Sequence, residues 1–211
     1  MTETSHISPG RELAEFVGRR VARLQTAYLD PTRSEGKAQL AELRKSAAEP
    51  GGSPNTWFME FEGFPGDLVG TRDEPYPAER AAHLAFTLYA IHQQSQNTAM
   101  HQFGREFGLG RAVARLQRQQ STSDPTGKLP TRFAALGTAS DFDEISHYAR
   151  QLITQLRAAA IPLDYGILAA QFLSLQYPSS AGFVRRAWGR DFAGTHSSSS
   201  SKSTESNQKE A

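Results

Sequence analysis

Apolar residues recur along this chain at the spacing of a helix, and no stretch shows the alternating apolar and polar pattern of a strand. The clearest example is PAERAAHLAFTLYAIHQQSQ, which starts at Pro77. Its apolar side chains fall on one side of a helix, and a proline suits the first helical turn because no hydrogen-bonded N–H is needed there. The pattern predicts an all-α fold.

The same spacing predicts helices along most of the chain. We expect them over residues 11–29, 35–49, 109–120, 140–160, 163–176 and 180–192, with a short helical turn over 131–137. Asp30-Pro31 ends the first of these helices, because a residue before proline is pushed out of helical geometry. Ser140 or Asp141 is the expected N-cap of the helix over 140–160, which accounts for the acids clustered there.

Turn-rich and polar segments divide the chain. The joint STSDPTGKLP, residues 121–130, predicts two linked helical bundles, an N-terminal helical domain over 1–122 and a C-terminal bundle over 123–193. Within the first domain, a long loop over 49–76 carries Trp57, Phe58, Phe61 and Phe64, which we expect to pack on the core or on a partner. Residues 194–211 are Ser-rich, have no large apolar side chain, and are expected to be disordered.

Composition excludes several classes of protein. The 211 residues include no cysteine, which excludes a disulfide framework, thiol catalysis and cysteine-based metal sites. The sequence has no run of about 18 apolar residues, so it predicts no membrane-spanning helix. Its N-terminus lacks the basic start and apolar core of a secretion signal. We therefore expect a cytoplasmic protein without membrane contact.

Motifs for catalysis or cofactor binding are also missing. Gly104, Gly108 and Gly110 precede a helix, but their spacing matches neither the dinucleotide fingerprint nor the P-loop, so they are expected to break one helix and let the next begin. His83 and His92 lie nine residues apart and face different ways, which is unfavourable for a shared metal. The sequence therefore predicts no catalytic residue, no metal and no cofactor, and a protein that is not an enzyme.

Charge is segregated although the net charge is only +1. Residues 57–80 contain six acids and two arginines, whereas residues 101–132 contain six Lys or Arg and two acids. In the helix over 109–120, Arg111, Arg115 and Arg118 fall on one side, opposite the apolar face, with no acid before Ser123. This distribution favours a surface that binds a polyanion.

Six segments, taken in order, resemble the CasB family, the small subunit of the type I-E CRISPR Cascade complex. They are KAQLAELRKSAAEPG, HLAFTLYAIHQQSQ, LGRAVARL, RFAALGTASDFDEISHYARQLI, IPLDYGILAAQFLSL and VRRAWGRDF, between about Lys37 and Phe192. The resemblance implies a non-catalytic, all-helical subunit that dimerises in the crRNA-guided complex and touches its backbone and large subunits. It also implies a basic groove that holds the displaced non-target DNA strand and stabilises the R-loop.

The resemblance further implies which residues line that groove. Basic positions of the family fall on Arg44, Lys45, Arg111, Arg132 and Arg150 of this chain. Thr131 stands where the family often has a second basic residue, and we expect Lys128 to compensate. Together with Arg115 and Arg118, these side chains are expected to converge into one trough for single-stranded DNA.

Three alternatives stay open at this point. The basic face could meet protein or guide RNA in a purely architectural subunit. The helix over 109–120 could be the recognition helix of a helix-turn-helix regulator, with Gln117, Gln119 and Gln120 reading bases. A hydrolase that uses the histidines has the least support.

Overall fold

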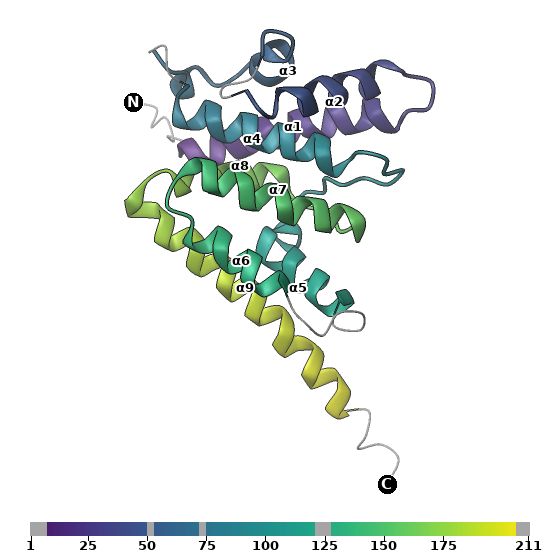
Figure 1. Ribbon diagram of the computed structural model, residues 1–211, viewed down its shortest axis with the longest axis vertical. Coiled ribbons are helices and arrows are strands. Elements are labelled where there is room, and N and C mark those ends of the chain that lie inside the picture. The colour runs from purple at the N-terminus through teal and green to yellow at the C-terminus, as the bar shows by residue number, and fades with distance from the viewer. Residues whose placement is uncertain (1–7, 50–52, 72–74, 121–127, 206–211) are drawn as a thin grey trace, which may run out of the picture.

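The structure, a computed structural model, describes residues 8–49, 53–71, 75–120 and 128–205, and every regular element within them is a helix (Figure 1). The α-helices are α1 Pro9–Leu29, α2 Glu35–Ser46, α3 Trp57–Phe61, α4 Pro77–His92, α5 Leu109–Gln120, α6 Lys128–Thr138, α7 Phe142–Ala158, α8 Tyr165–Leu175 and α9 Pro178–Glu205. Two short 3-10 helices, η1 Gly66–Leu68 and η2 Arg105–Phe107, complete the described elements. The predicted all-α fold is confirmed.

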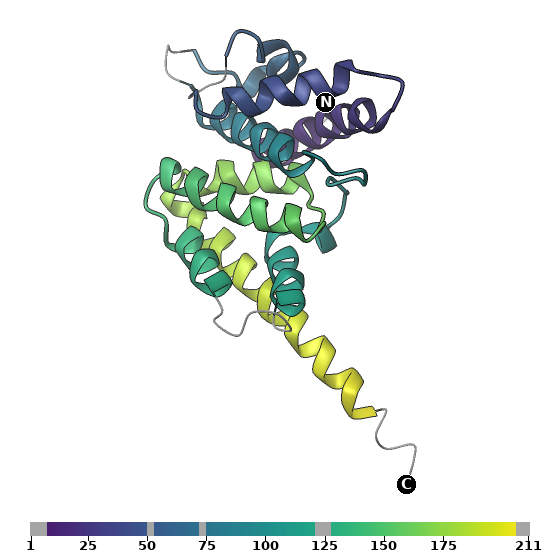
Figure 2. The same ribbon diagram turned by 45° about the vertical axis from the view of Figure 1, so that its right-hand side comes forward.

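The described helices form two groups. One group contains α1, α2, α4 and α8, the other α5, α6 and α9, and α7 lies between them (Figures 1 and 2). Each group mixes early and late parts of the chain, because α1 packs against α8 and α5 packs against α9. The predicted boundary falls within residues 121–127, outside the described residues, so the division at 122 and 123 stays a prediction.

α4 is the central helix of the first group. From Ala81 to Ala90 every side chain is buried, so this helix is covered on all sides rather than on one stripe. Neighbouring helices α1, α2, α7 and α8 supply that cover. A helix that is buried all round carries few polar side chains, and each of them must find a hydrogen-bond partner inside the protein. His92, the last residue of α4, and Gln93, its C-cap, are both buried and both form such hydrogen bonds.

The glycine segment before α5 breaks the chain as predicted, and the structure shows how. Gly104 has φ +128°, a conformation that favours glycine, and its N–H donates to Oδ2 of Asp164 at 2.9 Å. The other oxygen of Asp164 accepts from the N–H groups of Gly166 and Ile167, which caps α8. One carboxylate therefore fixes both the break after α4 and the start of α8.

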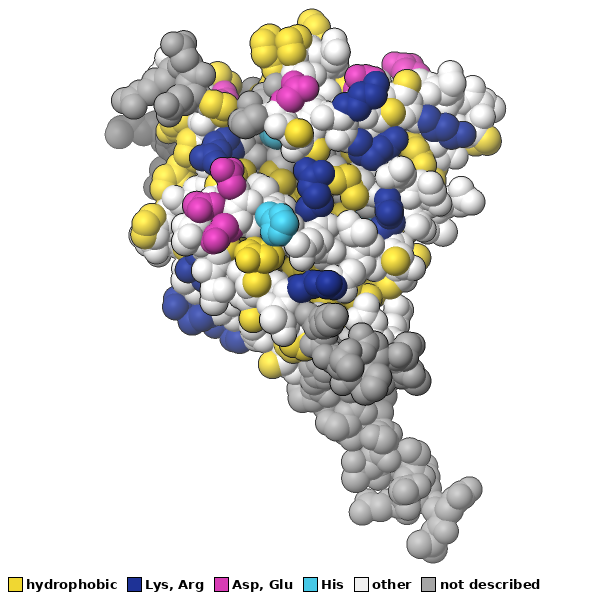
Figure 3. All heavy atoms as spheres, viewed as in Figure 1, with side chains coloured by type: hydrophobic (Ala, Val, Ile, Leu, Met, Phe, Trp, Pro, Cys, Tyr) yellow, Lys and Arg dark blue, Asp and Glu magenta, His cyan; other side chains and the backbone are white. Residues whose placement is uncertain are grey.

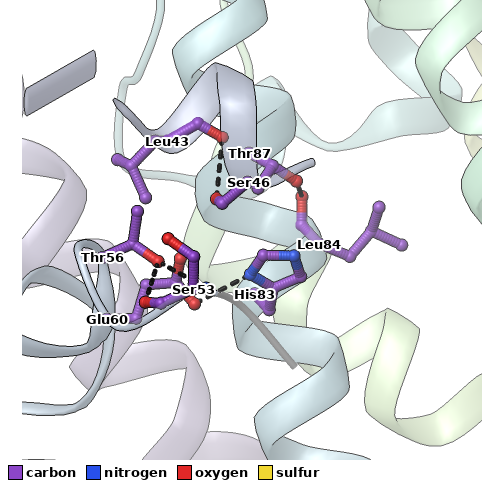
Figure 4. Close-up of polar contacts among 8 residues, drawn as sticks. All are labelled: Leu43, Ser46, Ser53, Thr56, Glu60, His83, Leu84 and Thr87. Atoms are coloured by element: carbon purple, nitrogen blue, oxygen red, sulfur yellow. Dashed lines mark hydrogen bonds and ion pairs between the residues drawn. The ribbon is translucent and has the colours of Figure 1, made fainter. Parts of the chain in front are cut away.

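A buried polar pair anchors the long connection over residues 49–76. Glu60 of α3 is fully buried, and its Oε2 lies 2.8 Å from Nδ1 of His83 on α4 (Figure 4). Next to it, the hydroxyl of Thr56 donates to the carbonyl of Ser53 and stabilises the turn that enters α3. The connection is therefore a structured cover on α4, although residues 50–52 and 72–74 lie outside the described residues.

The aromatic residues of this connection divide into two kinds. Phe64 packs edge-on against Phe16 of α1, which confirms core packing for that residue. Trp57 and Phe58 project into solvent, 51% and 81% exposed. A partner for these two side chains stays a prediction.

The structure defines two helix ends, and at the first it selects one of the two N-caps that the sequence predicts. Asp141, not Ser140, caps α7, because its Oδ1 accepts from the N–H of Glu144, whose own carboxylate accepts from Ser140. At the second, α9 ends at Glu205, and residues 206–211 lie outside the described residues. No helix in the described part of the chain is both long and apolar enough to cross a membrane.

Candidate nucleic-acid interface

Arginines from α2 and α7 meet at the C-terminal ends of α2 and α4. Nη1 of Arg44 on α2 donates to the carbonyl of Ala90 at 3.2 Å, and Nη2 of Arg150 on α7 donates to the carbonyl of Ala47 at 3.1 Å. These carbonyls belong to the last turns of their helices, where the helix dipole favours a positive charge. Both guanidinium groups therefore have a structural role, and each keeps further N–H groups for another acceptor.

Arg157 belongs to the same group although the sequence analysis did not name it. Its Nη1 donates to Oε1 of Gln94 at 2.9 Å, just beyond the end of α4. The same Nη1 lies 3.4 Å from the carbonyl oxygen of Ile91, next to the Ala90 carbonyl that accepts from Arg44, so the two cations lie near one another. Burial lowers the pKa of the Arg44 guanidinium, and the charge of Arg157 contributes less in the same direction. Arg157 follows Arg150 by seven residues, about two helical turns, and this spacing was the signal that could have identified it.

We call this group, Arg44, Arg150 and Arg157, the α2–α7 basic face. Among the described residues none of the three forms an ion pair with a carboxylate, so their charge is not neutralised there. Lys and Arg side chains are spread over the middle of the corresponding face, with acids at its upper and left edges (Figure 3). A hollow of about 390 Å³ adjoins the face, and its charged lining comprises Arg80, Arg150, Glu49 and Asp143 together with His83 and His147.

Two further predicted residues belong to α2 and to α6. Lys45 on α2 is exposed and pairs with Glu42 at 2.7 Å, an intrahelical contact of the kind that contributes little to stability. Arg132 lies half-buried on α6, which packs against α7. The side chain of Lys128 lies outside the described residues.

The arginines of α5 form a separate group with α9. Arg111, Arg115 and Arg118 line a pocket together with Arg190, and the acids of that pocket are Glu106 and Asp191. We call these six residues the α5–α9 cluster. Nε of Arg111 lies 3.5 Å from Oδ1 of Asp191, so part of the positive charge is compensated. The place of Arg190 in this cluster could not be predicted from the sequence, because it depends on the tertiary packing of α9 against α5.

Packing explains why the α5 arginines occupy this position. Leu109, Ala112, Val113 and Leu116 are buried, so the opposite, arginine-bearing side faces outward as predicted. A Cβ added at Gly110 would lie 2.5 Å from the carbonyl oxygen of Trp188 on α9, so a glycine permits this close approach of the two helices. The structure thus brings the predicted residues together in two groups, and their convergence into a single trough stays a prediction.

The histidines suggest no other chemistry. Burial lowers the pKa of His92 to about 3, and its Nδ1 lies 2.9 Å from the hydroxyl of Tyr165. Burial also lowers the pKa of His101, which lies in the core between the α4 and α8 segments. Within the described ranges, no three residues of the metal-binding types gather as a metal site would require.

Comparison with known proteins gives a consistent result. A family model described as CRISPR-associated protein Cse2 matches residues 39–192. CasB from Thermobifida fusca shares 37% sequence identity with this chain, and its crystal structure matches with a TM-score of 0.70 over 86% of this chain and 97% of that chain. A Cse2-family protein from Thermus thermophilus is 26% identical, with a TM-score of 0.60 over 89% of this chain and 99% of that one.

CasB from M. ruber, at 20% identity and a TM-score of 0.61 over 87% of this chain and 98% of that chain, shows the same fold. No protein with a curated description matches. The resemblance found in the sequence is confirmed: this chain belongs to the CRISPR-associated Cse2 (CasB) family.

Proposed function

We propose that this chain is a non-catalytic subunit of a type I-E Cascade complex in the cytoplasm, where it dimerises and holds the displaced non-target DNA strand. The α2–α7 basic face is the primary contact, with Lys45 and Arg132 beside it. Arg111, Arg115, Arg118 and Lys128 make further contacts along α5 and the start of α6. Membership of the Cse2 family supports the place of the chain in a CRISPR-associated complex.

The observation that carries the proposal is the charge state of the α2–α7 basic face. Its guanidinium groups donate to neutral acceptors, the carbonyls of Ala90 and Ala47 and the amide of Gln94, and thus keep their positive charge for an external anion. Arginines held on rigid helices meet phosphates without reading base sequence, which suits a strand of arbitrary sequence.

The energetic requirement on such a face is modest. R-loop formation exchanges one duplex for another of similar stability, so a few contacts to the released strand can shift the balance. If about five phosphates are neutralised, log K should fall with log salt at a slope near −3.5, since each single-strand contact contributes about −0.7.

A second candidate, a purely architectural subunit, is favoured by the same hydrogen bonds. Arg44 and Arg150 each stabilise a helix end, so both side chains have a reason to exist without DNA. In this case the basic face would contact protein or guide RNA of the complex.

One experiment separates the two. The crRNA-guided complex is purified with and without this chain, and both strands of a bound target are footprinted. Protection of the non-target strand that depends on this chain supports the proposal. Charge reversal at Arg111 and Arg132 should then leave assembly intact and weaken full R-loops, whereas lost assembly with no separate DNA defect would favour the architectural role.

A helix-turn-helix regulator is tested by the isolated protein and duplex DNA. That function requires a preference for particular sequences, read from α5. Uniform affinity for unrelated duplexes would eliminate it.

A further inference from the structure

A pocket of about 360 Å³ lies between η2, α5 and α9, within the α5–α9 cluster. Its polar lining comes from two distant parts of the chain: Glu106 of η2 with three arginines of the adjoining α5, and Arg190 and Asp191 of α9. This volume is at the lower end of the range of small-molecule sites, enough for a phosphate group with an attached sugar.

Two glycines shape this pocket. Gly110 lets the backbone of α5 approach Trp188, so the arginines of α5 face Arg190 across a short gap. A Cβ added at Gly104 would lie 2.5 Å from Oε2 of Glu106, which places this carboxylate over the loop at one edge of the pocket. The backbone therefore sets how closely the two helices that carry the arginines approach one another.

Arg115 is the member of the cluster whose environment most requires an anion. Its guanidinium lies over the ring of Phe107, 5.6 Å from the ring centroid, and its Nε and Nη2 are buried without a hydrogen-bond acceptor among the described residues. Burial, followed by the charges of Arg118 and Arg111, lowers the pKa of this guanidinium. Buried donors without acceptors are costly, and a bound anion would remove that cost.

The side chains of the pocket indicate the kind of ligand. Among the described residues they are mostly arginines, and Arg115 is the one whose buried N–H groups reach no acceptor. Arginine binds phosphate oxygens through pairs of N–H groups in a fixed geometry. We propose that the pocket between α5 and α9 binds a phosphate group, with Arg115 at its base and Arg190 at its rim.

This inference rests on the proposed function in so far as Arg111, Arg115 and Arg118 are also among its DNA contacts, but the pocket lies apart from the α2–α7 basic face and is tested with inorganic phosphate. The full-length chain is titrated with inorganic phosphate by calorimetry. Arg115→Gln and Arg190→Gln should each weaken binding about tenfold or more, the effect of losing a charged hydrogen bond. Arg19→Gln, an exposed arginine of α1, is the matched control and should change affinity less than about twofold.

Arg190 is exposed, so its substitution should preserve the fold even if that of Arg115 does not, and thermal unfolding of each variant checks this point. Absence of saturable phosphate binding in the native chain would overturn the inference. Equal phosphate affinity in the native chain and a folded Arg190→Gln variant would also overturn it.

Two short oligonucleotides, one with a 5′-hydroxyl and one with a 5′-phosphate, distinguish the sources of the phosphate. If inorganic phosphate competes equally with the binding of both oligonucleotides, the pocket binds a phosphate of the nucleic-acid backbone. If the 5′-phosphate raises affinity about tenfold and Arg115→Gln abolishes the gain, the pocket takes a terminal phosphate. Loss of phosphate binding in Arg190→Gln with intact protection of the non-target strand would uphold the pocket separately from the proposed function.

Discussion

The α2–α7 basic face and the α5–α9 cluster contain the same side chain in two different environments. On the face, Arg44, Arg150 and Arg157 lie over helix ends and donate to neutral carbonyl or amide oxygens. In the cluster, the arginines surround a pocket that also contains two carboxylates. We therefore propose the face as a contact for an extended polyanion and the cluster as a site for one anionic group.

The substitution with the largest expected effect disrupts the α5–α9 cluster and leaves the α2–α7 basic face intact. Gly110→Ala would place a Cβ 2.5 Å from the carbonyl oxygen of Trp188, so α5 and α9 must separate. We expect a loss of about 2–3 kcal/mol in the free energy of unfolding, measured by chemical denaturation.

Gly189→Ala in α9 is the matched control for this change. Its added Cβ meets open space, so the variant should gain up to about 1 kcal/mol from helix propensity. Equal destabilisation of the two variants would show that the close approach at Gly110 is unimportant.

Acidic pH should lower the stability of the protein through α4, whose C-terminal end lies under the α2–α7 basic face. Burial lowers the pKa of His92, the last residue of α4, to about 3, so the unfolded chain binds a proton below pH 6.5 that the folded chain does not. Stability should therefore fall as the pH falls, by about 1.4 kcal/mol per pH unit, or roughly 2–3 kcal/mol between pH 6.5 and 4.5.

Denaturation curves across this pH range check the effect of His92. His92→Gln should make the pH profile less steep, and the slope that remains should come in part from His101, whose pKa burial also lowers. A profile that stays equally steep in His92→Gln would assign the acid sensitivity to other groups.

A smaller effect tests whether Arg157 belongs to the face. Arg157→Gln removes one phosphate contact and should weaken single-stranded DNA binding by the complex about five- to tenfold, with a salt slope smaller by about 0.7. Filter binding over a series of salt concentrations measures both quantities. An unchanged slope would restrict Arg157 to its hydrogen bond with Gln94.

The smallest effect concerns Lys45. Its side chain is 72% exposed and paired with Glu42 on the same helix, so Lys45→Gln should change the free energy of unfolding by less than about 0.5 kcal/mol. The same filter-binding series should show a loss of DNA affinity of about twofold. A loss as large as that of Arg157→Gln would extend the face to Lys45.

The helices were predictable because their apolar residues repeat at a local period, and α4 and α5 begin where their proline and glycine signals indicate. The grouping of the arginines was not predictable in the same way. Arg150 and Arg157 share a face through helical spacing alone, but Arg190 meets Arg115 only because Gly110 lets α9 pack closely on α5. Pairing between helices depends on such long-range contacts, which no local pattern encodes.

The absence of cysteine from the sequence permits the most direct test of the proposed function. A single cysteine is introduced at His147, an exposed residue of α7 beside the face, and in a second variant at Phe183, an exposed residue of α9. Each variant is assembled into the crRNA-guided complex on a target whose strands carry thiol-reactive groups, and disulfide cross-links are quantified. We predict that His147→Cys cross-links to the non-target strand and that Phe183→Cys does so far less. Cross-linking of His147→Cys to the target strand or guide RNA instead, or equal cross-linking from both positions, would contradict the account.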